Sequence, residues 1–124
     1  MCKTGPYIQY ACVRISSLLE KAVSVGIKPG PITTLDKEAR SIILTLDQFK
    51  NIIEKSISAR KPHYLANHLF ELTNSYYSFY VNKRVLVDDI SKDTKVSRIS
   101  IALLVRTQLA LGLQLLGIEV PAKM

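Results

Sequence analysis

Apolar residues recur at steps of three and four along most of the chain, which is the spacing of one face of a helix. The stretch 62–84 organises the rest. Pro62 suits a first helical turn, where a missing N–H costs nothing. The pattern predicts a helix of about six turns, whose apolar face is formed by Leu65, Leu69, Leu72, Tyr76 and Phe79.

Two shorter patterns precede this stretch. The segment 7–25 predicts a helix ended by Gly26, with an apolar stripe of Ile8, Ala11, Ile15, Leu18, Leu19, Ala22 and Val25. Prolines on both sides of a glycine make 27–32 a loop, and Thr33 or Thr34 is expected to cap the next helix. Near Asp47 the apolar phase breaks before the pattern continues to about Ala59, so one kinked helix and two helices both fit.

The last pattern, 96–116, is apolar nearly all round and predicts a helix in the centre of a bundle. Ser97 or Thr94 is the expected cap, and Gly117 stops the helix. Polar residues interrupt the apolar run, so we expect a buried helix and no membrane span. The prediction is an all-α bundle of four to five helices, forming a single domain over residues 1–124 with no strand.

The charge of the chain narrows the class of partner. Seventeen Lys and Arg residues stand against ten acidic residues, which gives a net charge of +7. This excess favours a polyanion, either a nucleic acid or an anionic membrane surface, and does not choose between them. Cys2 and Cys12 form no disulfide framework, so a reducing compartment is expected.

No catalytic, metal-binding or cofactor-binding motif is present in the chain. The phosphate-binding loops, the zinc-protease pair and the nucleophile turn are all missing. His63 and His68 are five residues apart, a poor metal pair on a helix, and are expected at the surface or at a helix start. Cys12 falls on an apolar face, where inert packing is expected. The sequence therefore predicts a binding module without catalytic residues or metal ligands of its own.

Two groups of residues are candidates for nucleic-acid binding. Tyr76, Tyr77, Phe79 and Tyr80 crowd together just before Lys83 and Arg84, and aromatic faces beside positive charge suit unpaired nucleotides. The alternative is an aromatic core with a solvated basic end. Tyr7, Tyr10 and Arg14 fall close together on a helix surface. Half-buried packing for the tyrosines and a solvated arginine are the alternatives here.

Three stretches together resemble the C-terminal anticodon-binding domain of arginyl-tRNA synthetases, the all-helical domain named after its Asp-Ala-Leu-Arg motif. The first, Thr-Gly-Pro-Tyr-Ile-Gln-Tyr-Ala-Cys-Val-Arg, spans 4–14. The second spans 65–86, and the third is the tail from 106, which closes on Leu-Leu-Gly-Ile, then Pro-Ala-Lys-Met. The resemblance covers essentially the whole chain. Two positions depart from the family pattern: Cys12 stands where many members have histidine, and Arg84 where some carry an aromatic residue.

The resemblance implies a function that composition alone does not give. The parent enzymes join arginine to its tRNA, using ATP with magnesium, in a separate catalytic domain whose signatures are missing here. The chain thus looks like the anticodon-binding fragment of a larger cytoplasmic arginine–tRNA ligase, with no cofactor of its own. Its expected partners are the anticodon loop of an arginine tRNA, usually recognised at the central cytosine, and the catalytic domain, with no membrane.

The resemblance also implies which residues meet the RNA. Residues at the matching motif positions line the anticodon-loop surface of the family: Tyr7, Tyr10, Arg14, Tyr80 and Met124. Lys83 and Arg84 are added as phosphate ligands on charge alone. The rival interpretation is a helical protein-interaction module with a basic face, which predicts inward-packed tyrosines and only generic, salt-driven RNA binding.

Overall fold

The computed structural model describes residues 4–33, 37–82 and 91–117, and these ranges fold into five helices without a strand. The helices are α1 (Thr4–Ser24), α2 (Lys37–Asp47), α3 (Phe49–Ala59), α4 (His63–Asn82) and α5 (Lys92–Leu115). The predicted all-α bundle is confirmed. The phase break near Asp47 separates two helices rather than kinking one.

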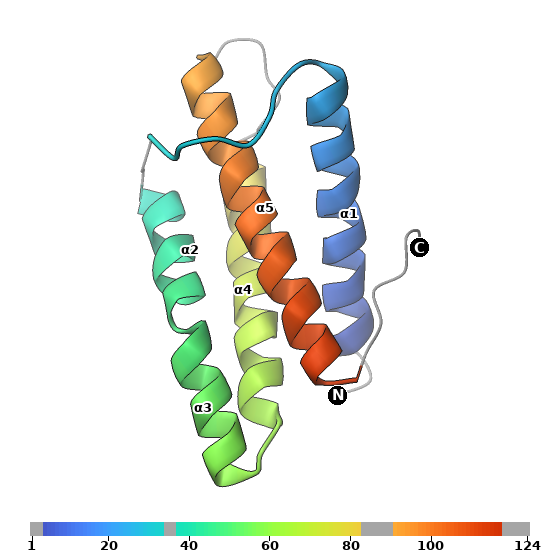
Figure 1. The fold of residues 1–124 in the computed structure, drawn as a ribbon, viewed down its shortest axis with the longest axis vertical. Helices are drawn as coiled ribbons and strands as arrows, with labels where there is room; N and C mark the ends of the chain where they lie inside the picture. The colour runs from blue at the N-terminus through green and yellow to red at the C-terminus, as the bar shows by residue number, and fades with distance from the viewer. Residues whose placement is uncertain (1–3, 34–36, 83–90, 118–124) are drawn as a thin grey trace.

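Four helices form the body of the bundle: α4 and α5 pack against each other, and both contact α1 on one side and α2 on the other. In Figure 1, α1 stands on one side and α2 on the other, while α5 crosses diagonally in front of α4. α5 packs on α1, α2 and α4, and α4 packs on α1, α2 and α3. The edge between α1 and α4 therefore lies opposite the edge between α2 and α5.

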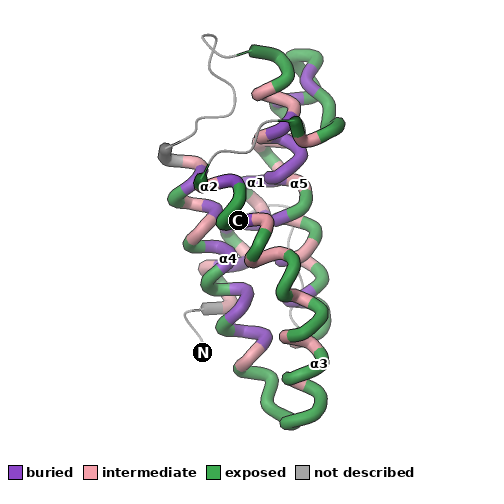
Figure 2. The backbone as a smooth tube through the Cα atoms, turned by 90° about the vertical axis from the view of Figure 1, so that its left-hand side faces the viewer, coloured by how far each residue is buried: buried purple, intermediate pink, exposed green. Residues whose placement is uncertain are grey.

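The core lies where α1, α4 and α5 meet, with α2 closing it. All five residues of the predicted apolar face of α4 are buried: Leu65, Leu69, Leu72, Tyr76 and Phe79. α3 contributes no buried residue, and Figure 2 shows it in green and pink, exposed or partly buried, beside the purple stripe of α4. Val25 was wrongly placed in the core and is 61% exposed. It falls beyond the last turn of α1, just before Gly26 takes a positive φ of 83°.

Two helices start before the predicted residue, and for α5 the reason is a side-chain cap. α1 begins at Thr4, three residues before the predicted start. α5 begins at Lys92, and its cap is Ser91, whose side chain accepts a hydrogen bond from the Thr94 N–H. Ser97 is instead buried and accepts a hydrogen bond from the Thr33 N–H. Thr33 lies well before α2, which starts at Lys37, and Thr34 lies outside the described residues.

α5 is long and apolar enough to cross a membrane by length and composition, but half of its apolar window is buried in the bundle. It is a core helix, as predicted. Its burial is one-sided, however, because Leu104, Leu111 and Leu115 stay about half exposed. The prediction of an apolar helix covered on all sides is therefore wrong for this face.

Candidate nucleic-acid interface

The first turns of α1 place three of the predicted residues on one exposed strip. Ile8 and Cys12 turn into the core, which leaves Tyr7, Tyr10 and Arg14 facing outward one turn apart. Tyr10 is 45% exposed, and the Arg14 guanidinium lies 5.6 Å from the centre of its ring. This is a cation–π distance, so the arginine and the ring support each other at the surface.

Tyr7 joins this strip to α4. Its hydroxyl donates a hydrogen bond of 2.7 Å to Asn74 Oδ1. Its ring centre lies 5.4 Å from that of Phe70 and 5.7 Å from that of Tyr77, both in tilted arrangements. These contacts unite Tyr7, Tyr10, Arg14, Phe70, Asn74 and Tyr77 into one patch at the α1–α4 edge, which we call the tyrosine surface.

The electrostatics of the tyrosine surface favour neutral phenols beside one positive charge. Partial burial raises the pKa of Tyr7. Burial also raises the pKa of Tyr77, and the nearby Arg14 guanidinium opposes that rise. The hydroxyls therefore keep their protons at neutral pH, while Arg14 supplies a cation. Flat neutral rings next to a guanidinium offer stacking for bases and charge for phosphate.

The predicted aromatic cluster at the end of α4 is divided between core and surface. Tyr76 and Phe79 are buried, as the core alternative required. Tyr80 is half-buried, contacts the Tyr76 ring at 6.1 Å, and packs against both the main core and the small cluster of Ala22, Ile27 and Ile99. Tyr80 lies about one turn after Tyr77 along α4, and the contacts of its ring are with the core. The remaining candidates, Lys83, Arg84 and Met124, lie outside the described residues.

Phe70 and Asn74 of the tyrosine surface were missed in the sequence, and Tyr77 was named there only as a member of the aromatic cluster at the end of the helix. They follow one another at steps of four and three along α4, next to the buried stripe, and Phe70 is 40% exposed. That spacing was a readable signal that they share a face. It did not reveal that Tyr7, more than sixty residues earlier, would pack across them.

His68 is buried, contrary to the prediction, whereas His63 starts α4 and is exposed. His68 Nε2 lies 2.8 Å from Gln108 Oε1, and Gln108 Nε2 donates to the Leu46 carbonyl at 3.0 Å. Because buried polar groups need partners, this relay explains how a histidine fits the core side of α4. It also ties the end of α2 to α4 and α5.

Cys12 packs in the core with a free thiol, as predicted. Burial raises its pKa from 9.0 to about 11, with the nearby Arg106 guanidinium opposing the rise. A protonated, enclosed thiol is a poor nucleophile. The family departure at this position therefore lies beneath the tyrosine surface rather than on it.

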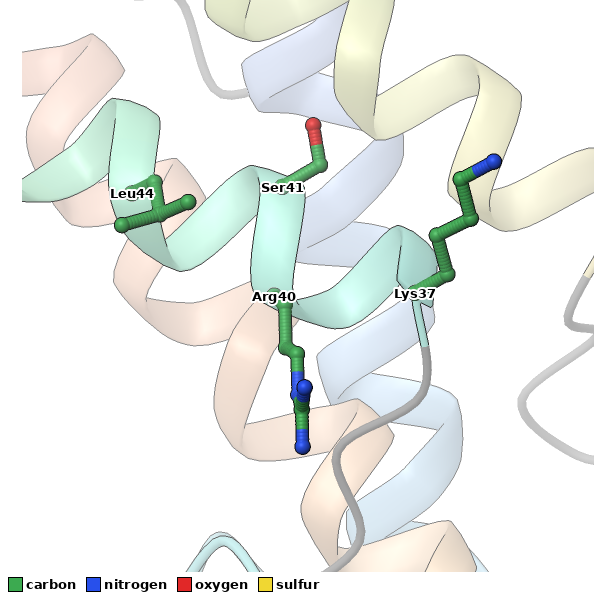
Figure 3. A pocket seen from close by; sticks show the side chains of 4 residues that line it. All are labelled: Lys37, Arg40, Ser41 and Leu44. Atoms are coloured by element: carbon green, nitrogen blue, oxygen red, sulfur yellow. The ribbon is translucent and has the colours of Figure 1, made fainter.

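Two concave areas lie elsewhere and have a different character. A groove of about 440 Å³ between α2 and α5 is lined mainly by apolar side chains, including Leu104 and Leu111, at the edge opposite the tyrosine surface. An open hollow of about 480 Å³ lies along α2. Figure 3 shows its two cations, Lys37 and Arg40, extending in different directions rather than converging. Within the described ranges no group of three or more potential metal ligands occurs.

Known proteins similar to this chain form one family. The model of the DALR anticodon binding domain family matches residues 8–124. The chain is 39% identical over 121 residues to an arginine–tRNA ligase of Methanocaldococcus jannaschii and 38% identical over 122 residues to one of Maricaulis maris, which covers 96% and 98% of this chain. It spans only about 21% of the length of these relatives.

Solved structures agree with the sequence relatives. An arginyl-tRNA synthetase of Thermus thermophilus superimposes with a TM-score of 0.82 at 32% identity, over 97% of this chain and 21% of that one. A structure described as a putative arginyl-tRNA synthetase from Campylobacter jejuni has the same fold, with a TM-score of 0.84 at 20% identity, over 98% of this chain and 26% of that one. The chain belongs to the DALR anticodon-binding domain family.

Proposed function

We propose that this chain binds the anticodon loop of an arginine tRNA and positions the tRNA for a catalytic domain of arginine–tRNA ligase. The observation that carries the proposal is the tyrosine surface, where Tyr7, Tyr10, Tyr77 and Arg14 meet at one exposed edge. Anticodon bases are single-stranded and can splay out, and aromatic faces beside a cation are what such bases stack on. Family membership and the net charge of +7 support the same partner.

The tRNA is held by this chain while the chemistry happens elsewhere. In this proposal the catalytic domain uses ATP with magnesium, and the described residues of this chain include no group of three or more potential metal ligands. Its contribution is orientation, because a loop fixed at one end of the tRNA restricts where the acceptor end can reach. The proposed setting is the cytoplasm, where a free Cys12 stays reduced.

The test is binding of the 124-residue chain to an arginine anticodon stem-loop and to the same loop with its central cytosine changed, near physiological salt. Tyr10→Ala is expected to weaken binding to the cognate loop by about 1–3 kcal/mol, the range for one stacked base. Tyr64→Ala is the matched control. Tyr64 also lies beside a cation, with Lys55 Nζ 4.6 Å from its ring centre, but on the α3–α4 side of the bundle.

Tyr80 needs a different variant because its ring packs on the core. Tyr80→Phe keeps that packing and removes only the hydroxyl, so a loss of loop binding there points to a direct contact. Equal binding of cognate and altered loops, together with a steep decline in salt, would identify generic polyanion binding and refute the proposal.

A further inference from the structure

The hydrogen bond between Tyr7 and Asn74 has a direction, and the direction restricts what Tyr7 can recognise. A phenol has one proton to donate and oxygen lone pairs that can accept. Here the proton is given to Asn74 Oδ1 over 2.7 Å. What the Tyr7 hydroxyl still offers to a ligand is therefore an acceptor.

The Tyr7 hydroxyl is neutral in this arrangement and has neighbours that restrict its ring. Burial raises the pKa of the phenol, so it stays protonated through neutral and mildly alkaline pH. Contacts to the rings of Phe70 and Tyr77 limit how far the Tyr7 ring can turn. Asn74 is an exposed residue of α4, so the Tyr7–Asn74 pair lies at the surface, where a ligand can reach it.

We infer that Asn74 is a specificity-determining residue, which holds the Tyr7 hydroxyl as a hydrogen-bond acceptor and so favours a nucleobase that presents an amino group over one that presents a carbonyl. The inference rests on the proposed function, because it assumes that an anticodon base reaches this surface. Cytosine carries an amino group at C4 and adenine one at C6, whereas uracil and guanine carry a carbonyl oxygen at those same positions. Two oxygen acceptors facing each other without a proton repel, and the group left unpaired loses its hydrogen bond to water.

Among pyrimidines this predicts recognition of cytosine through its 4-amino group. The neighbouring members of the tyrosine surface supply the stacking and the charge that one hydrogen bond cannot provide. Tyr10 is exposed for stacking, and Arg14 above it provides the charge for a phosphate. Affinity for the loop thus comes from several residues, while discrimination at one base comes from the orientation of one proton.

The experiment compares three stem-loops that differ only at the central anticodon base. They carry cytosine, uracil, or pyrimidin-2-one, which is cytosine without its amino group. Binding to the wild-type chain is expected to be about tenfold weaker for uracil and for pyrimidin-2-one, a difference of about 1.4 kcal/mol for each. The pyrimidin-2-one loop isolates the amino group, because it keeps the rest of the cytosine edge.

Two substitutions at one position separate orientation from mere contact. Asn74→Ala frees the Tyr7 hydroxyl to rotate and donate to the uracil carbonyl, so the preference for cytosine over uracil should fall to less than about threefold. Asn74→Asp keeps an acceptor oxygen facing Tyr7. Its added negative charge weakens every loop alike, and the preference should remain near tenfold. Tyr7→Phe should lose the preference while keeping the ring.

The outcomes distinguish this inference from the function beneath it. If Asn74→Ala folds and keeps the full preference for cytosine, or if Asn74→Asp loses it as completely as Asn74→Ala, the inference is overturned. If the wild-type chain binds the loop but does not separate cytosine from pyrimidin-2-one, the inference fails and the proposed function survives. If the wild-type chain binds none of the three loops above a scrambled hairpin, both fail.

Discussion

Replacing Gly112 with alanine tests the closest approach of two helices in the bundle. Gly112 is buried in α5, and a Cβ built there would lie 2.5 Å, 2.7 Å and 3.0 Å from Cδ2, Cδ1 and Cγ of Leu69 on α4. All three distances are shorter than carbon atoms normally approach. Because Leu69 is itself 0% exposed, its side chain has no solvent to move into.

Two opposing terms set the magnitude of this effect. Alanine is favoured over glycine inside a helix by about 1 kcal/mol. Overpacking a filled core costs about 1–3 kcal/mol, and here the whole branched end of Leu69 must turn. We therefore expect Gly112→Ala to lower the free energy of unfolding by about 1 kcal/mol, the difference between the middle of the overpacking range and the helix term.

The decisive measurement is a double-mutant cycle by urea unfolding. Leu69→Ala alone should cost about 2–5 kcal/mol by leaving a cavity. In that background the new methyl group has room, so Gly112→Ala should stabilise by roughly 1 kcal/mol through helix propensity. Gly26→Ala is the control, because Gly26 has a φ of 83° and open space around it, so its cost should be equal in both backgrounds. If Gly112→Ala has the same sign with and without Leu69, the argument from close packing is refuted.

Three further predictions concern charge, the buried relay and the thiol. Arg14→Ala should weaken binding to an anticodon stem-loop and lower the slope of log affinity against log salt by about 1. Lys55→Ala, the control, also removes a cation lying over a tyrosine ring and should leave cognate binding unchanged in the same titration. Gln108→Ala should lower the free energy of unfolding in urea by about 1–3 kcal/mol, because His68 and the Leu46 carbonyl lose their partner. Gln114 is exposed on the same helix, so Gln114→Ala should change the free energy of unfolding by less than about 0.5 kcal/mol. The pKa of Cys12 rises from 9.0 in the unfolded chain to about 11 in the folded one, so its neutral thiol favours the folded state below pH 9, and that contribution should be lost progressively as the pH rises from 9 to 11. The free energy of unfolding should therefore depend less steeply on pH across this range in Cys12→Ala than in the wild-type chain. An equal dependence in the two would contradict the assignment.

Local periodicity accounts for what could be predicted of the fold. The buried faces of α1 and α4 follow from steps of three and four, because a helix buries one face whatever its partner is. The start of α5 could not be read this way. Ser91, five residues before the predicted start at 96, captures the Thr94 N–H, and the polar residues between Ser91 and 96 carry no apolar signal.

His68 shows the limit of the same argument. It falls on the buried side of α4, between Leu65 and Leu72, where a polar residue is acceptable only with a partner. That partner, Gln108, is forty positions away on another helix. The pattern of α4 alone contains no information about it, so a surface position was the natural and wrong expectation.

The candidate site was predicted in the same uneven way. The spacing of Tyr7, Tyr10 and Arg14, together with the family resemblance, was enough to place them on one strip. The spacing of Asn74 showed only that it shares a face of α4 with Phe70 and Tyr77, because its importance comes from a contact between α1 and α4 that depends on how the two helices pack. Residues that act directly on a ligand can be found by type and spacing, whereas residues that orient them appear only once the helices are assembled.

The way the tyrosine surface is built also bears on how it binds. Its rings continue from the core without a break: buried Tyr76 contacts the rings of Tyr77 and Tyr80, and Tyr77 contacts Tyr7. Tyr7 is further fixed by Asn74, and the Arg14 guanidinium lies over the Tyr10 ring, which stays 45% exposed. Side chains held in this way lose little conformational freedom when a ligand arrives, which removes one of the main costs of association. The ordering cost of binding therefore falls on the RNA loop, whose bases must unstack, and differences in affinity between loops should follow how readily each loop opens as well as the identity of its central base.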